Sequence, residues 1–336
     1  MIPPVSATVI QSSSESGVCP PQKRVLVLSY SQTGQLDAIV ERLLAPLHAD
    51  GRIAIHREIL RPVVAFPFPW PWGRFFDAFP ESALMLPSAL APLTLTGEEC
   101  FDLVIVPYQV WFLAPSQPVT AFLQHPLCER MLRGKPVITV IACRNMWLLA
   151  QEKMKQLLAQ VGARLIDNVV LTDRAPTMAT LLTTPLWLLT GKRRLVPWLP
   201  PAGVATQDIE RATRFGRALL DALLHDRETQ ASPLLGGLQA VEVDPRLWLS
   251  ERAGTRSFFL WGKLVRLAGG PGAWARQPIL WLYLIFLLTL IITVVPVSLV
   301  LQALLRPLLR ERLAGLKQRF EQPSGSGNER LSQYDY

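Results

Sequence analysis

The chain has 336 residues, of which half are apolar and 18% are charged. This balance excludes a disordered chain and a membrane protein with many spans, and it favours a compact domain with an apolar attachment. The net charge is +8, and the basic excess lies between residues 246 and 319, so the remainder is close to neutral. Because nucleic-acid-binding domains carry their basic face on the folded part, we expect no nucleic-acid partner and a membrane surface instead.

The first residues and the cysteines indicate where the chain resides. Residues 1–22 lack the basic start and apolar core of a signal peptide, and they predict a disordered tail. The four cysteines form neither a CxxC pair nor a zinc-site spacing with histidine. We therefore expect a reducing compartment and no metal site.

Residues 23–226 alternate between strand and helix patterns. Short runs rich in Val, Leu and Ile predict buried strands, and amphipathic stretches between them predict helices. The predicted strands are residues 23–30, 52–59, 101–108, 135–143 and 163–173, and the predicted helices are residues 36–47, 119–133, 149–161 and 207–225. This alternation predicts an α/β fold with a five-stranded parallel sheet and helices on both faces.

Two insertions interrupt the pattern. Residues 61–87 are rich in proline and aromatic residues, and proline disfavours regular helix or sheet. They form either an apolar lid, a rim that touches lipid, or a loop folded onto the domain. Residues 177–201 place the basic run 192–194 between Trp and Leu clusters, which is typical of a helix among lipid headgroups.

A membrane segment is predicted near the C-terminus. Residues 227–277 are expected to be a juxtamembrane linker that contacts headgroups or forms a substrate rim. Residues 278–301 carry no charge, and a helix of that length reaches about 36 Å, enough to cross a membrane core of about 30 Å. We predict a transmembrane helix over residues 278–305 and a basic, polar tail over 306–336.

The orientation of this segment is open. Basic residues flank both ends, and the positive-inside rule favours a cytoplasmic tail, whereas the cysteines and the missing signal peptide favour a cytoplasmic domain. A single span cannot satisfy both. We expect a single-pass membrane protein with its domain on the cytoplasmic face; the alternative is a kinked, partly inserted hairpin around Pro296.

The loop after the first predicted strand indicates a ligand site. It comprises Ser31, Gln32, Thr33, Gly34 and Gln35, and we name it the phosphate loop. Amides at a helix N-terminus and hydroxyl donors favour an anion, and glycine permits close backbone approach. Neither GxxxxGK[ST] nor GxGxxG is present, so a P-loop and a dinucleotide fingerprint are excluded.

This loop resembles that of flavodoxins and related FMN reductases, which reads roughly [ST]-x-T-G-x-[ST]. Ser31, Thr33 and Gly34 match, while Leu36 stands where the last hydroxyl is usual. The resemblance implies that the phosphate loop binds the FMN phosphate. It also implies that the loops after the third and fourth strands flank the flavin ring.

Those two loops supply the remaining candidate residues. Tyr108, Trp111 and Phe112 are candidates to stack on the ring, and Cys143, Arg144 and Asn145 to bind its edge or an anionic substrate. Tyr108 and Arg144 are the candidate catalytic residues, by position only. The alternative for both loops is packing at the edge of the sheet.

A second resemblance covers nearly the whole chain. It rests on VLVLSYSQTGQLDAIVERLLAPL, FPFPWPWGRFFDAFP, ITVIACRNMW and ERAGTRSFFLWGKL. These segments resemble dialkylresorcinol condensing enzymes, which accompany a ketosynthase in bacterial pathways to dialkylresorcinols and aryl-polyene or flexirubin-type pigments. The resemblance implies a role in making a resorcinol lipid.

The residues favour an oxidation over a condensation. Thiolase-type condensation needs a Cys nucleophile with His partners on a duplicated fold, but the four histidines here are scattered and no duplication is present. We expect FMN-dependent aromatisation of a lipid-like dialkyl cyclohexanedione to a resorcinol. The alternatives are a flavin-free, membrane-tethered partner of a ketosynthase or acyl carrier protein, and a membrane quinone reductase or electron carrier.

Overall fold

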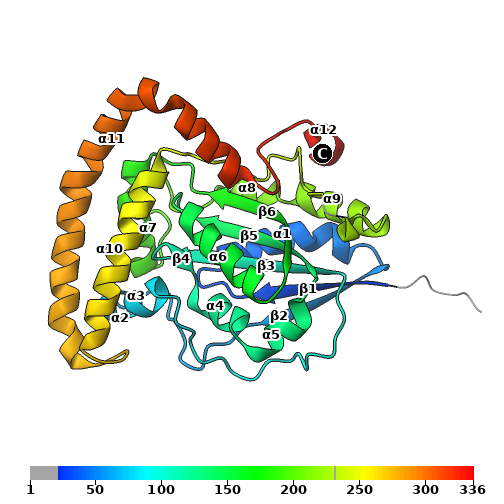
Figure 1. Cartoon of the computed structure of the whole chain (residues 1–336), viewed down its shortest axis with the longest axis horizontal. Coiled ribbons are helices and arrows are strands. Elements are labelled where there is room, and N and C mark those ends of the chain that lie inside the picture. Colours follow the sequence, from blue (N-terminus) through cyan, green and yellow to red (C-terminus); the bar gives the residue numbers. More distant parts are fainter. Residues whose placement is uncertain (1–21, 231) are drawn as a thin grey trace, which may run out of the picture.

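The structure is a computed structural model that describes residues 22–230 and 232–336, except for the side chains of 294–296 and 298–309. The tail predicted over residues 1–22 therefore lies almost wholly outside the described residues, as does the side chain of Pro296. The centre of the molecule is a twisted sheet with helices on both sides (Figure 1). Its strands are β1 (Lys23–Ser29), β2 (Ile53–Ile59), β3 (Leu103–Trp111), β4 (Ala114–Pro115), β5 (Pro136–Cys143) and β6 (Arg164–Thr172).

The strand order is β2-β1-β3-β5-β6, with all five parallel and the short β4 antiparallel beside β3. Without β4 this is the order 2-1-3-4-5 of the flavodoxin-like fold, whose order reverses between the first and third strands. The predicted fold class is confirmed. The reversal point lies at the carboxyl ends of β1 and β3, where open α/β sheets bind their ligands.

The helices that cover the sheet follow the predicted periodicity. α1 packs with α9 on one face, and α4, α5 and α6 cover the other (Figure 1). These helices are α1 (Gln35–His48), α4 (Gln117–Leu123), α5 (Pro126–Leu132), α6 (Leu148–Gln160) and α9 (Thr213–Leu224). The sequence predicted α4 and α5 as one helix, but Pro126 lacks the N–H that a continuous helix needs and begins α5 instead.

The first insertion contains two short helices, α2 (Trp72–Asp77) and α3 (Phe79–Ala83). Helices were not expected in this proline-rich segment. They form because Pro71 precedes α2 and Pro80 lies in the first turn of α3, positions at which a missing N–H breaks no helical hydrogen bond. The second insertion contains α7 (Thr177–Thr190), followed by α8 (Thr206–Glu210) and the 3-10 turn η1 (Arg227–Thr229).

The predicted juxtamembrane linker contains a helix of 21 residues, α10 (Leu247–Leu267), followed by the 3-10 turn η2 (Trp274–Arg276). With α3 and α11 (Gln277–Glu321), α10 encloses a second, smaller core of Phe79, Ala83, Val265, Leu280 and Tyr283. The rings of Phe79 and Tyr283 are stacked at 4.3 Å. The first insertion is thus part of the packed structure.

The predicted transmembrane segment lies within α11, which has 45 residues. By length and composition, the stretch Trp274–Thr293 suffices to span a membrane. Figure 1 shows α11 running alongside α10, bending, and returning to the domain. The tail, including α12 (Leu331–Tyr334), then packs on that domain, where Ser324 Oγ donates to Asp167 Oδ1 at 2.7 Å. This differs from the expected tail beyond a single span.

Candidate functional site

The loops after β1, β3 and β5 lie side by side at the carboxyl ends of these three central strands. The β1–β3 register pairs Val27 with Ile105, so Ser31 is level with Gln109 when the register is continued. Gln109 in turn pairs with Ala142 at the end of β5. The fold therefore brings the three predicted ligand-binding loops together.

The phosphate loop has the geometry of an anion site. Gly34 is the N-cap of α1 with φ 77°, and no atom lies within 4 Å of where a Cβ would be. Among residues 22–230 and 232–336, no side chain caps α1 by a hydrogen bond, and Thr33 Oγ1 lies a long 3.4 Å from Gln35 N. Ser31 Oγ is buried without a hydrogen-bond partner in the described part of the chain. Amides and hydroxyls are thus available to an anion.

The two glutamine side chains of this loop have structural partners. Gln32 Nε2 donates to the carbonyl of Pro67 at 3.1 Å. Gln35 forms a paired contact with Val204, since its Oε1 accepts from the backbone N at 2.9 Å and its Nε2 donates to the backbone O at 3.1 Å. They attach the first insertion, and the segment just after the second insertion, to the loop. Their side chains are therefore removed from the set of predicted phosphate donors.

Tyr108 does not have the predicted position beside a ring. Its side chain is fully buried under α6, and its hydroxyl donates to Gln151 Oε1 at 2.6 Å. Burial raises the pKa of this phenol well above its ordinary value. This placement is incompatible with the stacking and catalytic roles predicted for Tyr108. Side chains of a strand point alternately to its two faces, and that of Tyr108 points to the face covered by α6, where no ligand can reach it.

The other two aromatic candidates belong to an apolar wall. Phe112 and Leu113 have φ of 48° and 59° in the tight turn between β3 and β4. Trp111 contacts Phe66 and Trp70 of the first insertion, with ring centroids 4.9 and 5.9 Å apart. We call the cluster of these aromatic rings the aromatic wall, and its further members are Tyr30, Phe75, Phe79, Phe112 and Phe258.

The loop after β5 contributes a buried cation and an amide. The Arg144 guanidinium lies 3.5 Å from Thr180 Oγ1 and 3.2 Å from the Met146 sulfur, and within the residues described it forms no ion pair at 4 Å or less, although the carboxylates of Asp173 and Glu251 are near enough to affect its pKa. Burial lowers its pKa. Asn145 Nδ2 donates to Thr177 Oγ1 at 3.3 Å. Burial raises the pKa of the Cys143 thiol, which disfavours the nucleophilic thiolate form.

Glu251 lies at the same edge and was missed as a site residue. It belongs to α10, is fully buried, and its Oε2 accepts from Leu149 N at 2.9 Å in the first turn of α6. Burial raises its pKa to about 7, against the opposing effect of the α6 amides and Arg144. In the sequence, the one feature that could have indicated a functional role for Glu251 is that it is the only acid between residues 246 and 276.

Several buried polar atoms at this edge have no hydrogen-bond partner among the described residues. They are Ser31 Oγ, both amide atoms of Gln109, Asn145 Oδ1 and Glu251 Oε1. Unpartnered buried polar groups are rare in folded proteins because each costs about 1–3 kcal/mol. Their concentration at the ends of β1, β3 and β5 and at the start of α6 points to a polar ligand there.

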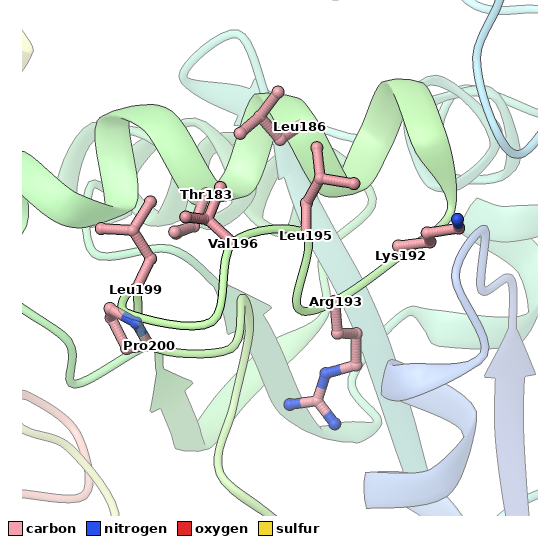
Figure 2. Close-up of a pocket in the computed structure, with 8 residues that line it drawn as sticks. All are labelled: Thr183, Leu186, Lys192, Arg193, Leu195, Val196, Leu199 and Pro200. Atoms are coloured by element: carbon pink, nitrogen blue, oxygen red, sulfur yellow. The ribbon is translucent and has the colours of Figure 1, made fainter.

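A hollow beneath α7 shows how the second insertion is used. Figure 2 shows Thr183 and Leu186 of α7 facing Leu195, Val196 and Leu199, while the Arg193 guanidinium turns away from them. That guanidinium donates to the carbonyls of Ala202 at 2.8 Å and Val204 at 2.8 Å. Because Val204 holds Gln35, this insertion supports the phosphate loop.

No protein-family model and no curated protein matches this chain. Among similar solved structures is a flavoprotein in complex with FMN from Lactobacillus acidophilus NCFM, with 12% identity and a TM-score of 0.35 over 45% of this chain and 93% of that one. A flavodoxin from the domain Archaea has 11% identity and a TM-score of 0.33 over 60% of this chain and 99% of that one. A flavone reductase has 12% identity and a TM-score of 0.32 over 64% and 67%. These likenesses are distant, and the flavodoxin-like fold class rests on the strand order.

Proposed function

We propose that this protein is a membrane-attached, FMN-dependent oxidoreductase that aromatises a dialkyl cyclohexanedione to a resorcinol. The observation that carries the proposal is the open phosphate loop together with the unpartnered polar atoms at the ends of β1, β3 and β5. The resemblance to dialkylresorcinol condensing enzymes supports the substrate class. The apolar stretch Trp274–Thr293 supports the membrane attachment.

The donors at the sheet edge fit FMN. The amides of the phosphate loop and the hydroxyls of Ser31 and Thr33 suit a phosphate dianion, with one donor fewer than usual because Leu36 is buried in the core. Gln109 and Asn145 offer unpartnered polar atoms to the polar edge of the ring. Trp111 of the aromatic wall remains the candidate for apolar contact with the ring.

The reaction removes two electrons and two protons from the substrate. Bound FMN supplies the acceptor for the hydride, which carries one proton and both electrons. The second proton goes to Glu251 Oε1, whose pKa of about 7 suits a general base at neutral pH. Arg144 stabilises the enolate that forms as this proton leaves. The aromatic wall holds the alkyl chains and excludes water.

A flavin-free partner of a ketosynthase or acyl carrier protein is the second candidate. The observation in its favour is the packing of the predicted ring contacts into the protein itself. Tyr108 is a core residue, Trp111 and Phe112 contact the first insertion, and Gln35 is bonded to Val204. In this interpretation the aromatic wall is a structural feature.

The test is an absorbance spectrum of the full-length protein purified in detergent. We expect absorbance bands at about 370 and 450 nm, as for flavoproteins in general. Their intensity should correspond to about one flavin per chain. Thr33→Asp should abolish them by placing a negative charge beside the phosphate. Thr229→Asp, at an exposed position in η1, is the control and should retain them.

The next measurement is anaerobic oxidation of a dialkyl cyclohexane-1,3-dione by flavin-loaded protein. We expect about one resorcinol per bound flavin in a single turnover. A colourless protein that takes up no added FMN would exclude the oxidoreductase and leave the flavin-free partner. Turnover of NAD(P)H with a quinone, without dione oxidation, would identify a quinone reductase.

A further inference from the structure

We propose that this protein attaches to one face of a lipid bilayer through the hairpin of α10 and α11 and does not cross it. The inference rests on the membrane attachment contained in the proposed function and specifies its form. It differs from the single span expected from the sequence, and also from the alternative of a hairpin around Pro296, because the two limbs are α10 and α11 and the turn between them lies at residues 268–276.

The first end of α11 is tied to the domain. Arg276, directly before α11, is fully buried, and its guanidinium lies 3.0 Å from Glu81 Oε2 and 3.3 Å from Asp77 Oδ1. Both acids belong to the first insertion. Breaking a buried ion pair of this kind costs about 3–5 kcal/mol, so this end of the helix is held firmly.

The other end of α11 returns to the same domain. Arg319 Nη2 lies 2.6 Å from Glu152 Oε2 on α6, and Phe320 packs in the main core with 2% of its surface exposed. A straight helix of 45 residues would extend about 67 Å. The bend seen in Figure 1 allows both ends to reach one domain.

The tail beyond α11 is built into that domain. Ser324 is 4% exposed, accepts from Asn168 N at 2.7 Å and donates to Asp167 on the edge strand β6. Arg211 Nε donates to Asp335 Oδ2 at 3.0 Å. A segment that completes the domain in this way lies on the same side of a membrane as the domain.

The hairpin presents an apolar face to its surroundings. On α11, Trp281, Ile285, Leu288 and Ile292 recur at helical spacing and are 48–71% exposed. On the second half of α10, the exposed large apolar residues are Phe259, Leu260, Leu264 and Leu267. The opposite sides of both helices fill the second core. Soluble proteins rarely expose apolar surface of this extent unless it binds something.

The chemistry of this face fits lipid. Lys263 lies exposed among its apolar residues on α10, whereas the partly exposed Arg266 is paired with Glu81 Oε1 at 3.2 Å, and Trp274 is 85% exposed at the tip of the hairpin. Basic residues and tryptophan beside an apolar face are typical of helices in the headgroup region of anionic membranes. The second half of α11, which returns to the domain, carries basic residues at 306, 310 and 312, and these disfavour insertion beyond one leaflet.

The first test compares the membrane side of the domain with that of the tail. In a Cys19→Ser background, the exposed Cys100 reports on the domain. Adding Cys100→Ser and Ser332→Cys moves the reporter to the exposed side of α12. A membrane-impermeant maleimide is applied separately to sealed right-side-out and sealed inside-out membrane vesicles. We expect both reporters to react from the same side, and reaction from opposite sides would overturn the proposal.

The second test uses vesicles of phosphatidylcholine with and without phosphatidylglycerol. We expect stronger flotation with the anionic lipid and a loss of more than about tenfold in the Leu264→Asp, Leu267→Asp double variant. Ile59→Asp, an exposed apolar position on β2, is the matched control and should float normally. If the Leu264→Asp, Leu267→Asp variant floats as well as the Ile59→Asp control, the proposal that this face binds the membrane is wrong.

The remaining outcomes separate this inference from the function. Wild type that neither floats nor sediments with membranes would remove the membrane attachment itself, whatever its flavin content. Dimers cross-linked through Leu264→Cys, without flotation, would assign the apolar face to a second copy. A flavin-free protein whose reporters share one side would retain the topology and remove only the oxidoreductase.

Discussion

At the scale of single residues, the carboxyl group of Glu251 lies in a buried environment that disfavours its charged form. It is fully buried, with Arg144, Cys143 and Tyr108 as its titratable neighbours, and burial raises its pKa from 4.5 to about 7. The folded protein therefore keeps a proton on Glu251 at pH values where the unfolded chain has lost it. Between about pH 4.5 and 7, the free energy of unfolding should fall as pH rises.

Glu251→Gln should flatten this pH dependence. The amide oxygen of glutamine can still accept from Leu149 N, so the contact with α6 is retained while the titration is removed. Urea denaturation at several pH values measures the slope. Asp167, whose buried carboxyl has its pKa raised to about 6, leaves a smaller slope of the same sign. An unchanged slope in the variant would show that Glu251 does not titrate in this range.

At the scale of elements, the contact between α1 and α9 depends on one glycine. A Cβ at Gly216 would lie 1.9 Å from the backbone oxygen of Leu43. The backbone of α1 cannot move without disturbing its buried face, which comprises Leu36, Ile39, Val40, Leu43, Leu44 and Leu47. The two helices therefore approach each other more closely than any side chain at this position allows.

Gly216→Ala should destabilise the protein by about 1–3 kcal/mol, as overpacking of a core does. Gly315→Ala is the matched control, since Gly315 is also helical but, in the described part of the chain, no atom outside its own helical turn lies within 4 Å of an added Cβ. The control should be neutral or slightly stabilising because alanine favours helix. Chemical denaturation of both variants checks the pair, and equal stability would contradict the close approach.

At the scale of the whole molecule, the chain closes on itself, because residues after α11 complete the domain formed by residues 23–226. Removal of residues 322–336 takes away the contacts of Ser324 with Asp167 and of Asp335 with Arg211. We expect the melting temperature to fall by about 5 °C or more, since several buried hydrogen bonds are lost. Thermal unfolding in detergent measures this, with Ser332→Ala as an exposed control. An unchanged melting temperature would indicate an independent tail.

The amino-acid sequence by itself determined the five parallel strands, the helices between them and the phosphate loop. Burial on both faces of a parallel strand leaves a continuous apolar run, and an anion-binding turn is encoded within a few residues. The sequence could not decide which way Tyr108 points, because a strand buried on both faces has no alternation to read.

Only the tertiary structure decided which distant residues meet. Glu251 reaches Leu149 across 102 residues, and Ser324 reaches Asp167 across 157. Periodicity reports the buried face of each helix but carries no information on its partner. For that reason the linker that became α10, the return of α11 to the domain and the acid beside Arg144 emerged only from the packed chain.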